Sequence, residues 1–130
     1  MRKAVGLATV VIVLIVVWFA HSELRESRYR ATLAHYQSDL PVGTPRAEVE
    51  EYLHSHEVQY MRDVVWVARR PYRSHAIAVP LGSTTGMFGC TSTAYLALEF
   101  EPSSSATRAD ATPVDRLKEI WISKVGRDCM

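Results

Sequence analysis

The sequence contains no asparagine, only three lysines beside twelve arginines, and only two cysteines. The absence of asparagine excludes N-glycosylation, because the acceptor motif requires that residue. Together with the scarcity of lysine it indicates a GC-rich, bacterial gene, since both residues have AT-rich codons. An excess of positive charge is absent too: residues 21–130 carry 13 Lys or Arg and 14 Asp or Glu. A nucleic-acid-binding protein would show a basic surface, so we expect no nucleic acid partner.

Charged residues are also missing from residues 4–20, an apolar run that follows Arg2 and Lys3. As a helix this run would be about 26 Å long, near the lower limit for crossing a bilayer. Trp18 and Phe19 stand near its end, where an interfacial aromatic anchor is expected. We therefore predict a transmembrane helix, with the lipid bilayer as the partner of this run.

A cleaved secretory leader is the alternative, because Ala20 and Ser22 place small side chains at the spacing of a cleavage site. The apolar run is longer than the usual core of a leader and is rich in Val and Ile. Both properties favour a retained signal anchor over residues 1–21. Arginines follow the run as well as precede it, so the charge count is nearly balanced between the two orientations.

The two cysteines, Cys90 and Cys129, bear on the compartment. An even number of cysteines behind an export-type N-terminus predicts one disulfide bond in an oxidising space, with two buried thiols as the alternative. Such a bond would close a loop of about 40 residues and add roughly 3–4 kcal/mol of stability. We therefore expect a single-pass protein of the bacterial inner membrane whose domain, residues 40–130, lies outside the cytoplasm.

Residues 22–39 are predicted to continue the first helix as a polar stem. Tyr29, Leu33 and Tyr36 have the i, i+4, i+7 spacing of a buried stripe. The segment Leu40-Pro41-Val42-Gly43 then ends the helix.

A second, short helix is predicted over residues 45–55. Thr44 is expected to cap its free amide groups, and Pro45 suits the first helical position because its φ is already set. One side of this helix is predicted to pack, and that side carries Val49, Tyr52, Leu53 and His56.

The remaining chain changes to the period of two that is typical of strands. Strands are predicted at residues 58–60, 64–69, 75–81, 93–101 and 116–125. Pro80 makes the third an edge or irregular strand, because proline cannot donate to a ladder. Residues 82–89 are expected to form a mobile turn, and residues 102–113 a loose loop. The fold class is therefore α+β: a transmembrane helix and stem, a short helix, and an antiparallel sheet of three to five strands.

A weak sequence pattern accompanies this layout. Gly43, Val49 and Leu53 form G-x(5)-V-x(3)-L, a Trp-bearing strand follows at residues 64–67, and a late strand pair covers 95–101 and 117–122. In these features the chain resembles the small bacterial envelope proteins of the SmpA/OmlA (BamE) type. The resemblance implies two helices followed by a three-stranded antiparallel sheet, and a non-enzymatic binding module of the envelope.

The sequence also departs from that family, whose members carry a lipid on a cysteine at the end of the leader. No cysteine precedes Cys90 here, so attachment to the outer membrane by lipid is not expected. Residues 1–6, MRKAVG, resemble instead the short basic leader of type IV pilin-like (pseudopilin) subunits. The fifth residue after Gly6 is Val11, where most pilins carry Glu, so a pilin-like subunit is kept as an alternative.

Histidines are the first candidates for chemistry. His54 and His56 would suggest a metal site if His35 or His75 supplied a third ligand. Residues two apart on a helix point about 200° away from each other, so these two cannot share an ion there. We therefore predict two semi-exposed histidines at a helix C-terminus and no metal.

Two other segments carry nucleophiles. Cys90 has no base beside it in sequence, and Ser83-Thr84-Thr85 lacks the Gly-Lys-Ser/Thr of a phosphate loop. We predict no catalytic residue and no cofactor. A small extracytoplasmic enzyme that uses His and Cys is kept as an alternative.

Arg69, Arg70 and Arg73 form the most concentrated basic patch, with Arg62 nearby. A solvated turn is the simpler interpretation. The functional one is contact with anionic lipid headgroups or an acidic partner, since each basic residue near a membrane adds about 1 kcal/mol of attraction. We predict a membrane-anchored, non-catalytic interaction or assembly module whose partner is another envelope protein.

Overall fold

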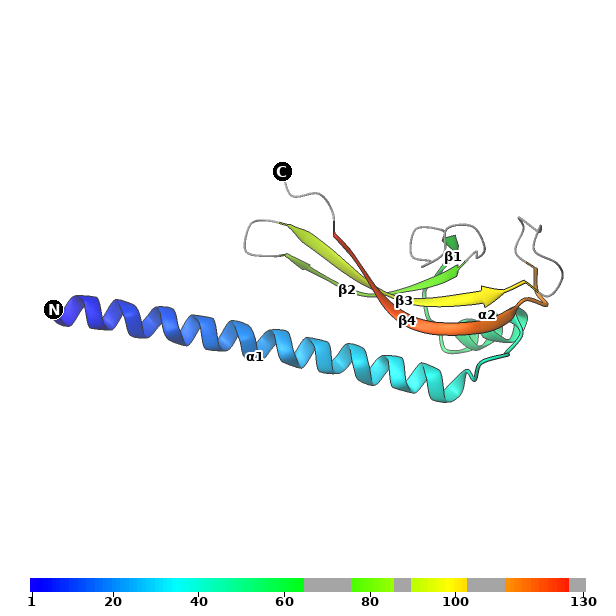
Figure 1. The fold of residues 1–130 in the computed structure, drawn as a ribbon, viewed down its shortest axis with the longest axis horizontal. Helices are drawn as coiled ribbons and strands as arrows, with labels where there is room; N and C mark the ends of the chain where they lie inside the picture. The colour runs from blue at the N-terminus through cyan, green and yellow to red at the C-terminus, as the bar shows by residue number, and fades with distance from the viewer. Residues whose placement is uncertain (65–75, 86–89, 103–111, 127–130) are drawn as a thin grey trace. The chain divides into compact units, whose positions relative to one another are not determined.

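In the computed structural model the described residues form two helices and four strands, in the order α1, α2, β1, β2, β3, β4 (Figure 1). The structure describes residues 1–64, 76–85, 90–102 and 112–126. The chain divides into two compact units, residues 1–32 and residues 33–130.

Helix α1 runs without interruption from Arg2 to Asp39, so the predicted anchor and stem are one helix. Its large apolar side chains from Val5 to Phe19 are exposed by 47% to 72%. The hydroxyl of Thr9 donates to the carbonyl of Val5 at 2.9 Å, which satisfies this polar group within the helix. By length and composition α1 is able to span a bilayer.

The last turns of α1 belong to the unit that begins at Leu33. Tyr36 and Leu40 are buried in the core of this unit, and Leu33 packs against the same core. The predicted buried stripe is therefore confirmed for Leu33 and Tyr36. The helix ends at Asp39, just before Pro41, where the break was predicted.

The strands form one antiparallel sheet in the order β1-β2-β3-β4 (Figure 1). Their bounds are Met61–Val64, Ala76–Thr85, Thr91–Glu101 and Arg116–Gly126. Each strand pairs with the next one along the chain, so the predicted antiparallel sheet and the α+β class are confirmed.

Helix α2, Arg46–Ser55, contributes the other side of the core. Val49 and Leu53 are fully buried and share a cluster with Leu96, Leu98 and Phe100 of β3. Burying each side chain of this size contributes about 1.5–3 kcal/mol. The alternation predicted for β3 is confirmed as well, because the intervening Ala97 lies in a separate cluster.

The start of α2 differs from the prediction. Thr44 does not cap the helix: its hydroxyl donates to the carbonyl of Pro41 at 2.6 Å. Pro45 occupies the N-cap position and makes no side-chain hydrogen bond. Its extended backbone, with φ −60° and ψ 146°, is the usual conformation of an N-cap residue.

The free amides at this helix start are satisfied by a distant segment of the chain. The amide of Arg46 donates to the carbonyl of Asp115 at 2.7 Å, and that of Ala47 donates to the carbonyl of Pro113 at 3.0 Å. Backbone groups just before β4 therefore do what a capping side chain usually does. This contact is invisible in a local sequence pattern.

The same two segments continue as a short antiparallel ladder. The amide of Gly43 donates to the carbonyl of Leu117 at 2.7 Å, and the amide of Leu117 donates to the carbonyl of Thr44 at 2.8 Å. We call the hydrogen bonds between residues 43–47 and 113–117 the backbone seam. Gly43 has φ +95°, a left-handed conformation that favours glycine.

Strand β2 corrects one expectation and confirms one of the two alternatives of another. Gly82, Ser83, Thr84 and Thr85 pair with β3, so the turn predicted for residues 82–89 is wrong at these four positions; residues 86–89 lie outside the described residues. Pro80 lies in an inner strand rather than an edge strand, although the predicted irregularity is present as a register shift between Pro80 and Gly82. Proline is tolerated there because, within the described residues, β1 pairs with β2 at Ala76 and Ala78 and not at Pro80.

The strand predicted at residues 58–60 is also wrong. Helix α2 ends in a Schellman motif, in which the amide of Val58 donates to the carbonyl of Leu53 and that of Glu57 to the carbonyl of His54. Val58 is thereby used to terminate the helix, and β1 begins at Met61. Of the strand predicted at 64–69, only Val64 lies within the described residues, at the end of β1.

Glu57 provides a test of this motif, because its φ of 55° is left-handed. In a residue that has a Cβ this conformation is unfavourable by about 1–2 kcal/mol. Glu57→Gly should raise the free energy of unfolding by about 0.5–1 kcal/mol, since part of the gain is lost to the greater chain entropy of glycine. Urea denaturation of the detergent-solubilised chain measures this. Glu57→Ala removes the same charge but keeps the Cβ, so an equal gain in both variants would contradict the conformational explanation.

Candidate functional site

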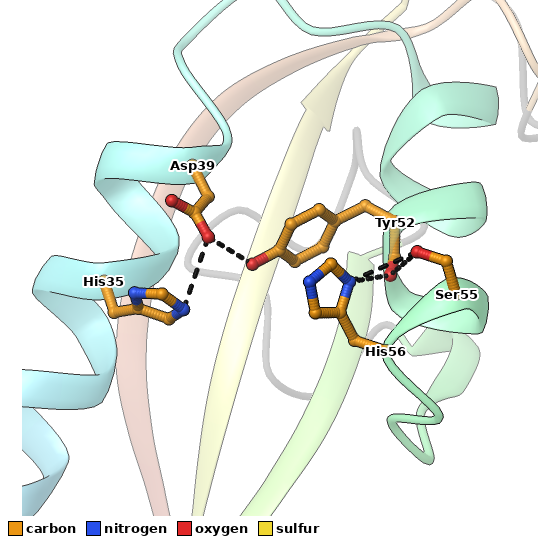
Figure 2. Close-up of polar contacts among 5 residues, drawn as sticks. All are labelled: His35, Asp39, Tyr52, Ser55 and His56. Atoms are coloured by element: carbon orange, nitrogen blue, oxygen red, sulfur yellow. Dashed lines mark hydrogen bonds and ion pairs between the residues drawn. The ribbon is translucent and has the colours of Figure 1, made fainter.

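A group of polar and aromatic side chains lies where the end of α1 meets α2. Figure 2 shows His35 and Asp39 of α1 beside Tyr52, Ser55 and His56. We call these five residues the junction cluster.

Asp39 connects the two helices. The hydroxyl of Tyr52 donates to its Oδ2 at 2.5 Å, and Nε2 of His35 lies 3.3 Å from the same oxygen. The His35 side chain is 64% exposed, so its contact with Asp39 is a surface ion pair when the imidazole is protonated, and such pairs contribute little. The Tyr52 hydrogen bond links α2 directly to the end of α1.

Aromatic rings surround this hydrogen bond. The Tyr36 and Tyr52 rings meet edge to face with centroids 6.0 Å apart, and the His56 ring lies 4.1 Å from that of Tyr52. Burial raises the pKa of Tyr52, and the hydrogen bond to the carboxyl group of Asp39 and its negative charge raise it further, to about 12. Burial also raises the pKa of Tyr36. Tyr52 is therefore a hydrogen-bond donor at neutral pH and not a base.

Ser55 and His56 resemble a nucleophile and a base, because Oγ lies 3.2 Å from Nδ1. Nδ1 also lies 2.8 Å from the carbonyl oxygen of Tyr52, which accepts hydrogen bonds only, so Nδ1 carries the proton. The Ser55 hydroxyl donates to the same carbonyl at 2.9 Å. His56 therefore cannot take the proton of Ser55 in this arrangement, and both side chains serve to terminate α2.

The histidines do not form a metal site in the described part of the chain. His54 is exposed, and His56 turns to the Tyr52 ring instead. Across residues 1–64, 76–85, 90–102 and 112–126 no group of three His, Cys, Asp or Glu side chains is placed to hold an ion. His75 lies outside the described residues.

A second polar group lies on the other side of α2. The side chain of Arg46 is only 5% exposed; its Nε lies 3.6 Å from Oε1 of Glu50, and its guanidinium lies 5.0 Å from the centroid of the Phe100 ring. The carboxylate of Glu50 also contacts Arg62: Nε of Arg62 lies 3.1 Å from Oε1, and Nη2 donates to Oε2 at 3.1 Å. One carboxylate thus pairs with a buried and an exposed arginine, which is a structural use of all three side chains.

Of the four arginines predicted to contact lipid headgroups or a partner, the structure describes only Arg62. Arg62 is exposed by 61% but engaged by Glu50. Arg69, Arg70 and Arg73 lie outside the described residues, so the basic patch stays a prediction.

The predicted disulfide is not tested either. Cys90 is partly buried directly before β3, and Cys129 lies outside the described residues. Thr44 and Pro45 do stand at the helix start, with the corrected roles given above. Ser83, Thr84 and Thr85 are strand residues, so they form no phosphate-binding loop.

Comparisons with family models, with curated proteins and with solved structures find no match to this chain. The resemblance to the SmpA/OmlA (BamE) type therefore remains a prediction from the sequence.

Two structural features were missed at the sequence level. Arg46 is buried, although the first turn of a helix usually exposes a charged side chain, and only its i, i+4 spacing to Glu50 hinted at a pair. The Asp39–Tyr52 hydrogen bond joins residues on two different helices, so no periodicity marks it.

Tyr52→Phe should lower the free energy of unfolding by about 1 kcal/mol, because it removes one hydrogen bond and keeps the ring. The stability that comes from the raised pKa of Tyr52 is complete below pH 10 and is lost as the pH rises from 10 to about 12. Urea denaturation at pH 8 and pH 11 should therefore show a smaller difference between wild type and variant at the higher pH. An equal difference at both values would contradict the assignment.

Glu50→Gln should destabilise the domain by about 1–3 kcal/mol, because it removes the carboxylate that pairs with the buried Arg46. Glu51→Gln is the matched control, since Glu51 is the exposed neighbour on the same helix and should change stability by less than about 0.5 kcal/mol. Denaturant titration of both variants decides the point; equal effects would mean that the Arg46 pair is unimportant.

Proposed function

We propose that this protein is a single-pass membrane protein whose domain acts as a non-catalytic interaction or assembly module of the bacterial envelope. The observation that carries the proposal is helix α1, which is apolar and exposed over residues 4–20 and ends in the core of the unit that begins at Leu33. One helix thus carries the apolar anchor segment and, in its last turns, contributes to the core of the folded domain.

Retention of the anchor is supported by the helix itself. Helix α1 is continuous through Ala20 and Ser22, the two residues with the spacing of a cleavage site. No glycine or proline occurs between Gly6 and Pro41, so the sequence supplies no residue that would break the helix at the cleavage position. We place the domain outside the cytoplasm because the two cysteines, Cys90 and Cys129, follow an export-type N-terminus, a combination typical of an oxidising compartment.

A binding role is favoured over catalysis by the polar groups of the described residues. The hydroxyl of Tyr52 donates to Asp39, and the side chains of Ser55 and His56 donate to the carbonyl of Tyr52. Glu50 pairs with two arginines. Each of these contacts stabilises the domain, and none leaves a base facing a nucleophile. The partner we propose is another envelope protein, as the SmpA/OmlA (BamE) resemblance implies.

The pilin-like subunit stays as a second candidate because α1 is a single uninterrupted helix with an apolar first half. A pilin-like subunit would be processed after Gly6, whereas an anchored module keeps its N-terminus. Mass spectrometry of the protein purified from membranes separates the two, because processing would remove residues 1–6.

Membrane insertion has a direct test. Ile12→Arg, in the middle of the apolar run, should move much of the protein out of the alkali-resistant membrane fraction, because a central arginine costs about 2.5–3.5 kcal/mol. Leu24→Arg is the matched control, since Leu24 is equally exposed in α1 but lies beyond the run. Equal extraction of the two variants would refute the anchor.

Partner binding is tested by affinity capture of the tagged full-length protein from membranes. Replacing Arg69, Arg70 and Arg73 together by Gln should weaken capture of the partner by up to about fivefold for each arginine that contacts it, because an exposed ion pair contributes at most about 1 kcal/mol. The control removes three arginines of the stem, Arg25, Arg28 and Arg30.

Two further outcomes decide between the alternatives. His54→Ala with His56→Ala should leave capture unchanged for an interaction module, whereas loss of a measurable activity in this double variant would favour an enzyme. If the variant of Arg69, Arg70 and Arg73 captured as much partner as the stem variant, the basic patch would not be the binding surface. The proposal of a membrane anchor would not be affected.

A further inference from the structure

The part of α1 that follows the apolar run separates its charged side chains around the helix. Arg25 and Arg28 are three residues apart, so they are neighbours on one face. Glu23 and Glu26 lie about 100–200° away from these arginines around the helix axis. The face that carries the two arginines therefore has no acidic side chain over residues 18–32.

Neither arginine is neutralised by the protein within the described residues. In this part of the chain the side chains of Arg25 and Arg28 form no ion pair and no hydrogen bond. Arg28 is exposed and Arg25 is partly buried. Because like charges at this helical spacing repel each other, the pair is suited to an anion from outside the protein.

This arginine pair stands directly after the segment that we propose to cross the bilayer. Trp18 and Phe19 are exposed by 51% and 58% at the end of the apolar run, where interfacial aromatic residues are found. The Cα atoms of Arg25 and Arg28 lie about 9 Å and about 14 Å beyond that of Phe19 along the helix. Since Cα–Cβ bonds tilt toward the N-terminus of a helix, both long side chains can reach back toward the headgroup layer.

We propose that Trp18, Arg25 and Arg28 form a binding site for the headgroup of an anionic phospholipid. The inference rests on the membrane anchor of the proposed function and adds the class of lipid that the anchor selects. Arg25 is seven residues after Trp18 and so lies on nearly the same side of the helix. Guanidinium groups bind phosphate oxygens through paired N–H donors, and the indole N–H supplies a further donor. A zwitterionic headgroup carries its own cation, so the arginines favour a headgroup of net negative charge.

The test is native mass spectrometry of the full-length chain in nanodiscs with equal amounts of phosphatidylglycerol and phosphatidylcholine. The measured quantity is the ratio of protein that retains one phosphatidylglycerol to protein that retains one phosphatidylcholine. The wild type should favour phosphatidylglycerol by up to about fivefold for each arginine that contacts it. Arg25→Gln combined with Arg28→Gln should bring the ratio close to one.

Arg30→Gln is the matched control. Arg30 is exposed like Arg28 and follows it by two residues, but it lies about 200° away around the helix. The ratio of this variant should equal that of the wild type. Equal losses in Arg28→Gln and Arg30→Gln would overturn the inference, because the preference would then depend on net charge and not on one face.

The anchor and the lipid site can fail separately. A ratio of one in a wild-type chain that resists alkaline extraction would overturn the lipid site and leave the anchor, whereas extraction of the wild type would remove both. Soluble glycerol phosphate should leave the ratio unchanged. If it displaced the retained phosphatidylglycerol, the arginines would bind a free phosphate anion and the assignment to a lipid would be wrong.

Discussion

The backbone seam between residues 43–47 and 113–117 is the constraint on which the rest of the domain depends. Its hydrogen bonds satisfy the first amides of α2 and pair the chain before α2 with the start of β4. Because these groups are backbone donors and acceptors, leaving them unpaired in a buried position would cost about 1–3 kcal/mol each. The seam therefore fixes where α2 begins and which edge of the sheet it lies beside.

Two consequences follow for the packing. With its start held at β4, α2 presents Val49 and Leu53 to the sheet, where they meet Leu96 and Leu98. Its first residue, Arg46, is drawn over the Phe100 ring and needs Glu50 as a counter-charge. A helix of ten residues is marginal in isolation, so this tertiary packing supplies most of its stability.

The junction cluster shows why a functional interpretation needs geometry. A histidine, a serine and a carboxylate stand close together, yet the direction of each hydrogen bond assigns them to helix ends and to the α1–α2 contact (Figure 2). The sequence analysis correctly placed His54 and His56 at a helix end. It did not find the Asp39–Tyr52 bond, because that bond forms only after the chain reverses at Pro41 and Gly43.

The sequence by itself determined the elements whose signal is local. The apolar run of α1, the break after Asp39, α2 and the alternation of β3 all arise from periodicity and from proline and glycine, which act within a few residues. The tertiary structure alone decided how α2 is capped, that Pro80 lies in an inner strand, and that Arg46 is buried. These features depend on which distant backbone groups come within hydrogen-bonding distance, and a local pattern carries no information about such pairs.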